Sequence, residues 1–251
     1  MLIKRKRIRS HLEDRWLALV LATSAGTLNA MALGAFGFFP SHMSGNTSQI
    51  STEVSTSNLK DLVFLTTILI AFIAGAFSAR VTVAAGLNKK LRTIYCLILL
   101  AEGAALALLS LFELRFYTAA VNRESVVFLA FLMGIHNATS TQLSNGRVRS
   151  THITGTVTDA GIALGSVVAG WLSRNDKTGW RSQYMVLSTH LTTLFSFVAG
   201  GIGGLLLYRL AGFSAMLAVG VFLMVVATSA IVIALYTTRK RRIRSNSPQN
   251  A

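Results

Sequence analysis

The 251-residue sequence contains one cysteine, two prolines and only nine acidic residues. The single cysteine, Cys96, excludes an internal disulfide and any cysteine-based zinc or iron–sulfur site. Charged residues make up 13% of the chain, well below the roughly 25% that is typical of soluble domains. Hydrophobic residues make up 52%. A chain with so few charged side chains cannot cover a water-exposed surface, so the composition predicts a membrane protein.

Lysine and arginine outnumber the acidic residues by 24 to 9, which gives a formal net charge of +15. These basic residues gather in the two tails, 1–15 and 238–251, and in short gaps between apolar runs. Basic clusters beside apolar runs are typical of membrane orientation and of binding to anionic lipid headgroups. No aromatic residues alternate with them and no soluble domain presents a groove, so we expect anionic lipid, and no nucleic acid, as their partner.

Apolar runs long enough to cross a bilayer occur six times. They lie at approximately 16–39, 62–86, 93–113, 126–145, 184–208 and 212–237. None alternates as barrel strands do, so the fold class is an all-α membrane protein with six transmembrane helices. Six crossings put both termini on one side. If that side is cytoplasmic, only four of the 24 basic residues lie outside: Lys60, Arg115, Arg123 and Arg209.

Residues 157–172 are also apolar but short for a crossing. A seventh full span there would move the C-terminal basic tail to the outside, against the charge distribution. The pattern therefore favours a re-entrant half-helix and leaves a full span as the alternative.

Three short motifs occur twice, in the same order. They are Gly-Thr-Leu-Asn-Ala at 26–30 with Gly-Ile-His-Asn-Ala at 134–138, 41–46 with 151–156, and 65–75 with 191–200. Each copy belongs to a unit of three spans, 16–113 and 126–237. Because three is odd, the second unit enters the membrane from the opposite side, which predicts two inverted repeats. Each repeat is expected to have a glycine-containing break or half-helix after its first span.

These motifs, with Met-Ser-Gly-Asn-Thr at 43–47 and Thr-Gly-Thr at 154–156, resemble the YoaK-like bacterial membrane proteins of domain of unknown function family 1275. The resemblance covers nearly the whole chain outside the basic tails. It implies a six-helix, multi-pass protein of the bacterial inner (plasma) membrane, in a family without an established activity whose members are sometimes labelled as transporters. Members often carry Asp at the position of Asn29 and Gln at that of His136, so a mechanism with a carboxylate at position 29 does not carry over.

The two glycine motifs are candidates for substrate binding. Glycine lets the backbone leave helical geometry, and nearby Ser, Thr or Asn caps the helix that follows. The free N–H groups of such a half-helix attract an anion or a carbonyl oxygen, although a plain capped loop has the same pattern. In span interiors, an asparagine amide binds solute or clamps two helices together. The candidates are Asn29, Ser44, Gly45, Asn46, Asn137, Thr154, Gly155 and Thr156.

Two further residues are candidates for proton coupling. Glu102 lies inside the third apolar run, where an ionised carboxylate is costly unless it is paired or hydrated. His190, near the start of the fifth run, is the second candidate. Alternatively, Glu102 is a structural partner of another buried group, and His190 is a packed histidine without a role in proton transfer. His42 and His152 occupy equivalent repeat positions without acidic or cysteine neighbours, so we expect no metal and no other cofactor.

The inverted repeats favour a small-solute secondary transporter or exporter, with its site between the repeats and with proton coupling as an option. The sequence has no phosphate-binding loop, nucleophile elbow or other catalytic set, so we expect no enzyme. The alternatives are a membrane-embedded enzyme acting on a lipid-like substrate, and a channel or non-catalytic scaffold. The glycine-rich segment 199–204 suits either a homodimer contact or packing within one chain. The solute, the coupling ion and the direction of transport are left open.

Overall fold

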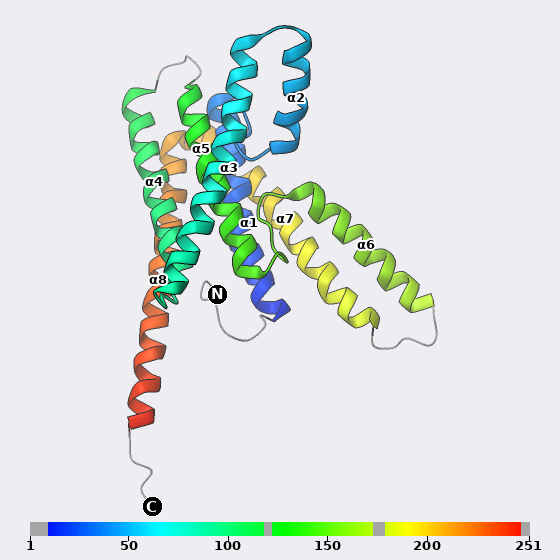
Figure 1. Cartoon of the computed structure of the whole chain (residues 1–251), viewed down its shortest axis with the longest axis vertical. Helices are drawn as coiled ribbons and strands as arrows, with labels where there is room; N and C mark the ends of the chain where they lie inside the picture. The colour runs from blue at the N-terminus through cyan, green and yellow to red at the C-terminus, as the bar shows by residue number, and fades with distance from the viewer. Residues whose placement is uncertain (1–9, 118–121, 173–178, 247–251) are drawn as a thin grey trace, which may run out of the picture.

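The computed structural model describes residues 10–117, 122–172 and 179–246. Every regular element in these ranges is an α-helix (Figure 1). The helices are α1 (His11–Phe36), α2 (Met43–Ser55), α3 (Leu59–Asn88), α4 (Ile94–Phe116), α5 (Arg123–Ser144), α6 (Ile153–Leu172), α7 (Gly179–Ala211) and α8 (Phe213–Asn246). Several basic residues lie outside the described part: those of 1–9, Arg174, Lys177 and the side chains after position 237. The predicted binding of the tails to lipid headgroups therefore concerns mostly residues that are not described.

Seven of the described helices are long and apolar enough to cross a membrane, which confirms an all-helical, multi-pass membrane protein. Each of the six apolar runs falls in one of them: α1, α3, α4, α5, α7 and α8. The seventh is α6, which forms 20 residues of continuous helix where the sequence left a half-helix and a full span open. In the first half of the chain, the 13-residue α2 follows the matching sequence motif, and α2 is too short to cross.

The helices run in two opposite directions (Figure 1). Helices α1, α4 and α7 run toward the upper end of the view, and α3, α5 and α8 run toward the lower end. After a short turn back, α2 runs upward as α1 does, and α6 runs downward as α5 does. Neither α2 nor α6 therefore reverses the path of the chain. As a result, α1 begins and α8 ends at the same end of the molecule.

Glycines bring helices from the two halves of the chain into backbone contact. A Cβ atom on Gly26 of α1 would lie 2.1 Å from the carbonyl oxygen of Phe197 in α7. A Cβ atom on Gly134 of α5 would lie 2.2 Å from the carbonyl oxygen of Phe72 in α3. Both glycines open a copy of the repeated Gly-x-x-Asn-Ala motif, so α1 packs on α7 as α5 packs on α3. Small residues allow this close approach in lipid, where packing rather than the hydrophobic effect holds helices together.

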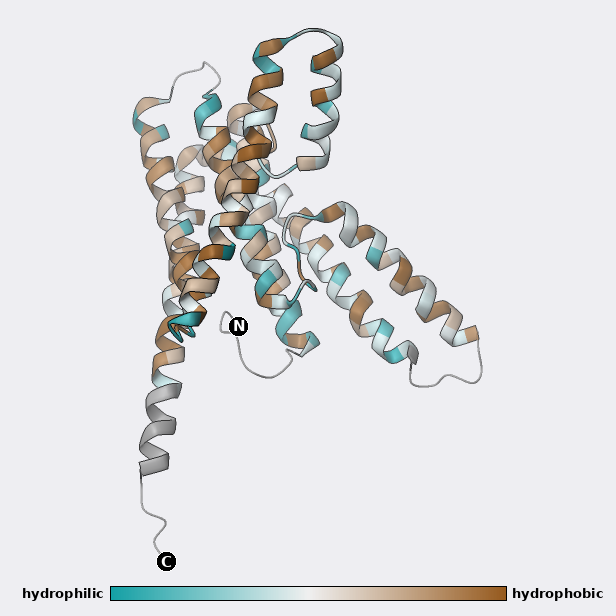
Figure 2. Ribbon diagram, in the orientation of Figure 1, coloured by the Kyte–Doolittle hydropathy of each residue, from teal (hydrophilic) through white to brown (hydrophobic). Residues whose placement is uncertain are grey.

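The buried core follows α1, α4 and α5, whereas large apolar side chains cover much of the outer surface. Leu17, Leu21, Tyr95 and Met133 are fully buried. On the outside, Trp171 of α6 is 80% exposed and Leu210 of α7 is 85% exposed. Figure 2 shows apolar residues along the helices and hydrophilic ones mostly near their ends. This distribution fits a protein whose surrounding solvent is lipid.

Candidate functional site

The two repeated asparagines hold the connections that lead into α2 and α6. The Oδ1 atom of Asn29 accepts hydrogen bonds from the backbone N–H of Ser41 at 3.1 Å and from its hydroxyl at 2.7 Å. The Oδ1 atom of Asn137 accepts one from the backbone N–H of Thr151 at 3.3 Å. These equivalent contacts turn the chain back along α1 and α5. The amides therefore clamp helix to loop, a role related to the clamping of two helices that was the alternative to solute binding.

Gly45 and Gly155 lie inside the first turns of α2 and α6, and neither has a left-handed backbone. Each leaves room for a histidine ring that precedes its helix. A Cβ atom on Gly45 would lie 2.1 Å from the ring of His42, and one on Gly155 would lie 2.3 Å from the ring of His152. The helix break that was expected at these glycines therefore lies before them in the chain. The glycines themselves are helical and leave space for the histidine rings.

The remaining residues of the two glycine motifs divide between surface and interior. Ser44 and Thr154 are exposed. Asn46 and Thr156 are buried, and the hydroxyl of Thr156 donates to the carbonyl oxygen of His152 at 2.9 Å. Among the described residues, no group of three histidine, cysteine or acidic side chains lies close enough to share a metal ion.

Glu102 and His136 form a buried pair in the middle of the helix bundle. The Oε1 atom of Glu102 in α4 lies 2.6 Å from Nδ1 of His136 in α5, and both side chains are 1% exposed. The other ring nitrogen, Nε2, lies 2.9 Å from the carbonyl oxygen of Leu21 in α1. A carbonyl oxygen only accepts, so Nε2 carries a hydrogen. The pair therefore joins three helices, α1, α4 and α5.

The second carboxylate oxygen of Glu102, Oε2, is buried and has no hydrogen-bond partner among the described residues. Glu102 also lines a cavity of about 370 Å³ between α3, α4 and α5. The other lining residues are Ser78, Ala79, Thr82, Ile94, Leu97, Ile98, Ala101, Ala105, Phe128, Phe131, Leu132 and Ile135. The cavity is therefore apolar, with two hydroxyls and a single acidic group in its wall.

A second cavity, of about 560 Å³, lies along α3 and α5 toward their N-terminal ends. Lys60, Arg123 and Glu124 line its polar end. Phe128 and Phe131 line both this cavity and the one at Glu102. The two aromatic side chains are thus shared by the cavity with the charged end and the cavity that Glu102 lines.

Two more carboxylates are buried in the described ranges, and each has partners. Glu113, also in α4, accepts hydrogen bonds from the amide of Asn122 at 2.9 Å and from the hydroxyl of Ser125. Asp14 of α1 is fully buried, and its Oδ2 lies 2.7 Å from Nε of Arg147. Unlike Glu102, neither residue lines a cavity described above. They are therefore structural partners rather than candidates for proton coupling.

His190 is half-buried in α7, with the charged residues Asp159 and Arg149 in its surroundings. The histidine that meets Glu102 is His136, which the repeat does not single out because the equivalent residue is Leu28.

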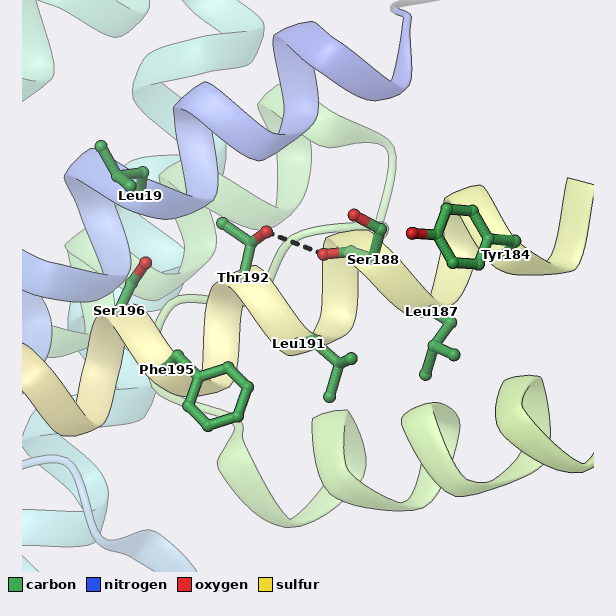
Figure 3. A pocket seen from close by; sticks show the side chains of 8 residues that line it. All are labelled: Leu19, Tyr184, Leu187, Ser188, Leu191, Thr192, Phe195 and Ser196. Carbon is green, nitrogen blue, oxygen red and sulfur yellow. Dashed lines mark hydrogen bonds between the residues drawn. The ribbon is translucent and has the colours of Figure 1, made fainter. Parts of the chain in front are cut away.

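A shallow groove of about 350 Å³ lies on α7 and is lined by Leu19 and by residues of α7 such as Tyr184 and Ser188 (Figure 3). None of the predicted site residues lines this groove.

Two buried hydroxyls on the lower side of the pair also lack hydrogen-bond partners within the described residues. They belong to Tyr95, two turns before Glu102 in α4, and to Thr139, one turn after His136 in α5. Since α4 runs upward and α5 downward, both lie toward the end where α1 begins (Figure 1). Sequence reasoning missed His136 as the partner of Glu102, and it missed Tyr95, Thr139 and Glu113. The 11-residue spacing of Glu102 and Glu113, about three helical turns, was the available signal for the last of them.

The apolar helices, the lipid-facing surface and the buried pair define a multi-pass helical membrane protein. The model of the family described as "Protein of unknown function (DUF1275)" matches residues 17–229. The chain therefore belongs to this family, and the match includes Glu102, His136 and the two repeated asparagines. No curated protein and no solved structure matches the chain.

Proposed function

We propose that the protein is a proton-coupled secondary transporter or exporter of a small solute in the bacterial inner membrane. The buried Glu102–His136 pair carries this proposal. It joins helices from both halves of the chain at the wall of a cavity, and both side chains are 1% exposed. Ionisable residues at such depth are costly to insert and are typical of proton and solute pathways in membrane proteins.

The arrangement of the helices supports an inverted-repeat transporter with six crossings. The contacts of α1 with α7 and of α5 with α3 use equivalent glycines, and Asn29 and Asn137 make equivalent hydrogen bonds. Helix α2 runs in the same direction as α1, and α6 runs in the same direction as α5 (Figure 1). Six crossings then bring both basic tails to the cytoplasmic side, where anionic lipid is their expected partner.

The pair is suited to exchange a proton because its two groups compete for the same one. With the proton on His136, the carboxylate of Glu102 is ionised and the pair is neutral overall. When the proton leaves, the pair becomes negative in an apolar environment, which only a cation or a new proton relieves. The unpartnered hydroxyls of Tyr95 and Thr139 lie between the pair and the lower end, and we assign them to the proton route.

The test uses purified protein in proteoliposomes that enclose a pH-sensitive dye. Candidate solutes are added outside, and the solute-dependent proton flux is recorded. We expect Glu102→Gln to abolish this flux and Tyr95→Phe to slow it. Glu113→Gln is the matched control, since it alters a buried carboxylate of the same helix that does not line the cavity. Its flux is expected to stay close to that of the wild-type protein.

Flux that persists in Glu102→Gln would refute proton coupling through this residue and make the pair structural. Flux lost equally in Glu102→Gln and Glu113→Gln would show that any change in buried charge disables the protein. Solute uptake without proton flux, measured with a labelled solute, would keep transport and remove the coupling.

A further inference from the structure

The cavity beside Glu102 has a composition that selects its ligand. We propose that it binds a small organic ammonium ion with an apolar, preferably aromatic, body. As a substrate class this rests on the proposed transport function, whereas the binding itself is a separate property of the cavity. The same site would reject anions and bind uncharged compounds of the same shape much more weakly.

The charge of the ligand follows from the free oxygen of Glu102. The carboxylate has two oxygens, and His136 occupies only Oε1. The buried Oε2 has no hydrogen-bond partner in the described part of the chain. A buried carboxylate oxygen left unpaired is costly, and a donor that carries positive charge relieves the cost best. An ammonium group supplies both the hydrogen-bond donor and the charge.

The apolar body follows from the rest of the wall. Most of the lining side chains are aliphatic or aromatic, and the polar lining residues besides Glu102 are the hydroxyls of Ser78 and Thr82. The faces of Phe128 and Phe131 offer further attraction to a cation. A volume of about 370 Å³ suits a compound of modest size, and the mostly apolar wall offers few oxygens to replace the water shell of an inorganic ion.

The route to the cavity fits an amphiphilic cation. Leu97 and Phe128, which line the cavity, are 41% and 39% exposed on the surface of the helix bundle. In the bilayer this surface faces lipid, so a ligand that dissolves in lipid reaches Glu102 from the side.

The test measures binding of tritiated 2-phenylethylammonium to the full chain in lipid nanodiscs, with empty nanodiscs as background. Unlabelled 2-phenylethanol and 3-phenylpropionate serve as competitors that keep the ring and change the charge. We expect saturable binding that neither competitor displaces at concentrations at which the unlabelled amine does. Glu102→Gln should weaken binding by about ten- to hundredfold, the range of a lost charge-assisted hydrogen bond.

Two further variants distinguish loss of binding in the cavity from a general effect of mutation on the protein. Ala105→Phe fills the cavity while keeping the carboxylate, so it should abolish binding even if Glu102→Gln does not fold. Glu113→Gln should bind as the wild-type protein does. Thermal unfolding of each variant establishes that it is folded.

The outcomes distinguish this inference from the proposed function. Binding without solute-driven proton flux would support the ammonium site and overturn coupled transport. Absence of saturable binding, equal displacement by 2-phenylethanol, or unchanged binding in Ala105→Phe would each overturn the ammonium site. If the ammonium site is overturned but an anionic or neutral solute drives proton flux, the transport proposal still holds.

Discussion

Two adjacent glycines of α7 allow a direct test of the contact between α1 and α7. A Cβ atom on Gly204 would lie 2.5 Å from the carbonyl oxygen and 2.7 Å from the Cα atom of Thr27, whereas one on Gly203 would have no atom within 4 Å. We therefore compare Gly204→Ala with Gly203→Ala. The two variants add the same methyl group to the same helix and differ only in what the methyl group meets.

The expected sizes follow from two opposing effects. Replacing glycine by alanine inside a helix stabilises it by about 0.5–1 kcal/mol, and Gly203→Ala should show this gain alone. In Gly204→Ala the obstructing atoms are backbone, so α1 and α7 must separate by about 0.9 Å to reach the ordinary contact distance of 3.4 Å. Such overpacking costs about 1–3 kcal/mol. At roughly 2–4 °C per kcal/mol, Gly204→Ala should melt several degrees below Gly203→Ala.

The single, fully buried Cys96 provides the assay. A maleimide dye that fluoresces on reaction with a thiol reports unfolding when heating exposes this residue. Equal melting temperatures for the two variants, or a higher one for Gly204→Ala, would refute the close contact between α1 and α7.

The same assay checks three other predictions. Asn29→Ala should cost about 1–3 kcal/mol, because both the N–H and the hydroxyl of Ser41 lose their acceptor. Asn137→Ala, which removes one hydrogen bond, should cost about 0.5–1.5 kcal/mol, and the reverse order would contradict the roles assigned to the two asparagines. Arg147→Met removes the ion pair with the buried Asp14 and should lower the melting temperature by several degrees, whereas a shift no larger than that of exposed Arg149→Met would make the ion pair unimportant.

Hydropathy located the six main helices but not where each begins. Polar residues extend several of them beyond their apolar runs. Helix α1 begins at His11, five residues before the predicted start, because Ser10 and Glu13 form a capping box. Helix α3 begins at Leu59, where the side chain of Asn58 accepts a hydrogen bond from the N–H of Asp61. Such caps depend on local hydrogen bonds that an apolar window does not detect.

The candidate site could be predicted in part. Glu102 stands out because a carboxylate in an apolar run needs a partner. Its partner, His136, does not, because the register of α4 against α5 depends on packing that sequence periodicity does not encode. The repeat was no guide either, since the pair is asymmetric and Leu28 takes the place of histidine in the first half. Repeats reveal what the two halves share, whereas this pair is one of their differences.

The packing of α1 on α7 has a consequence for how the protein is made. The residues that meet at Gly26 and Phe197 are more than 170 positions apart in the chain. During synthesis α1 is made before α7, and its glycine-lined face stays without its partner until α7 has been translated. In a nascent chain that stalls before α7, the face of α1 that normally contacts α7 is left exposed. Membrane quality-control proteins are expected to recognise such an exposed face.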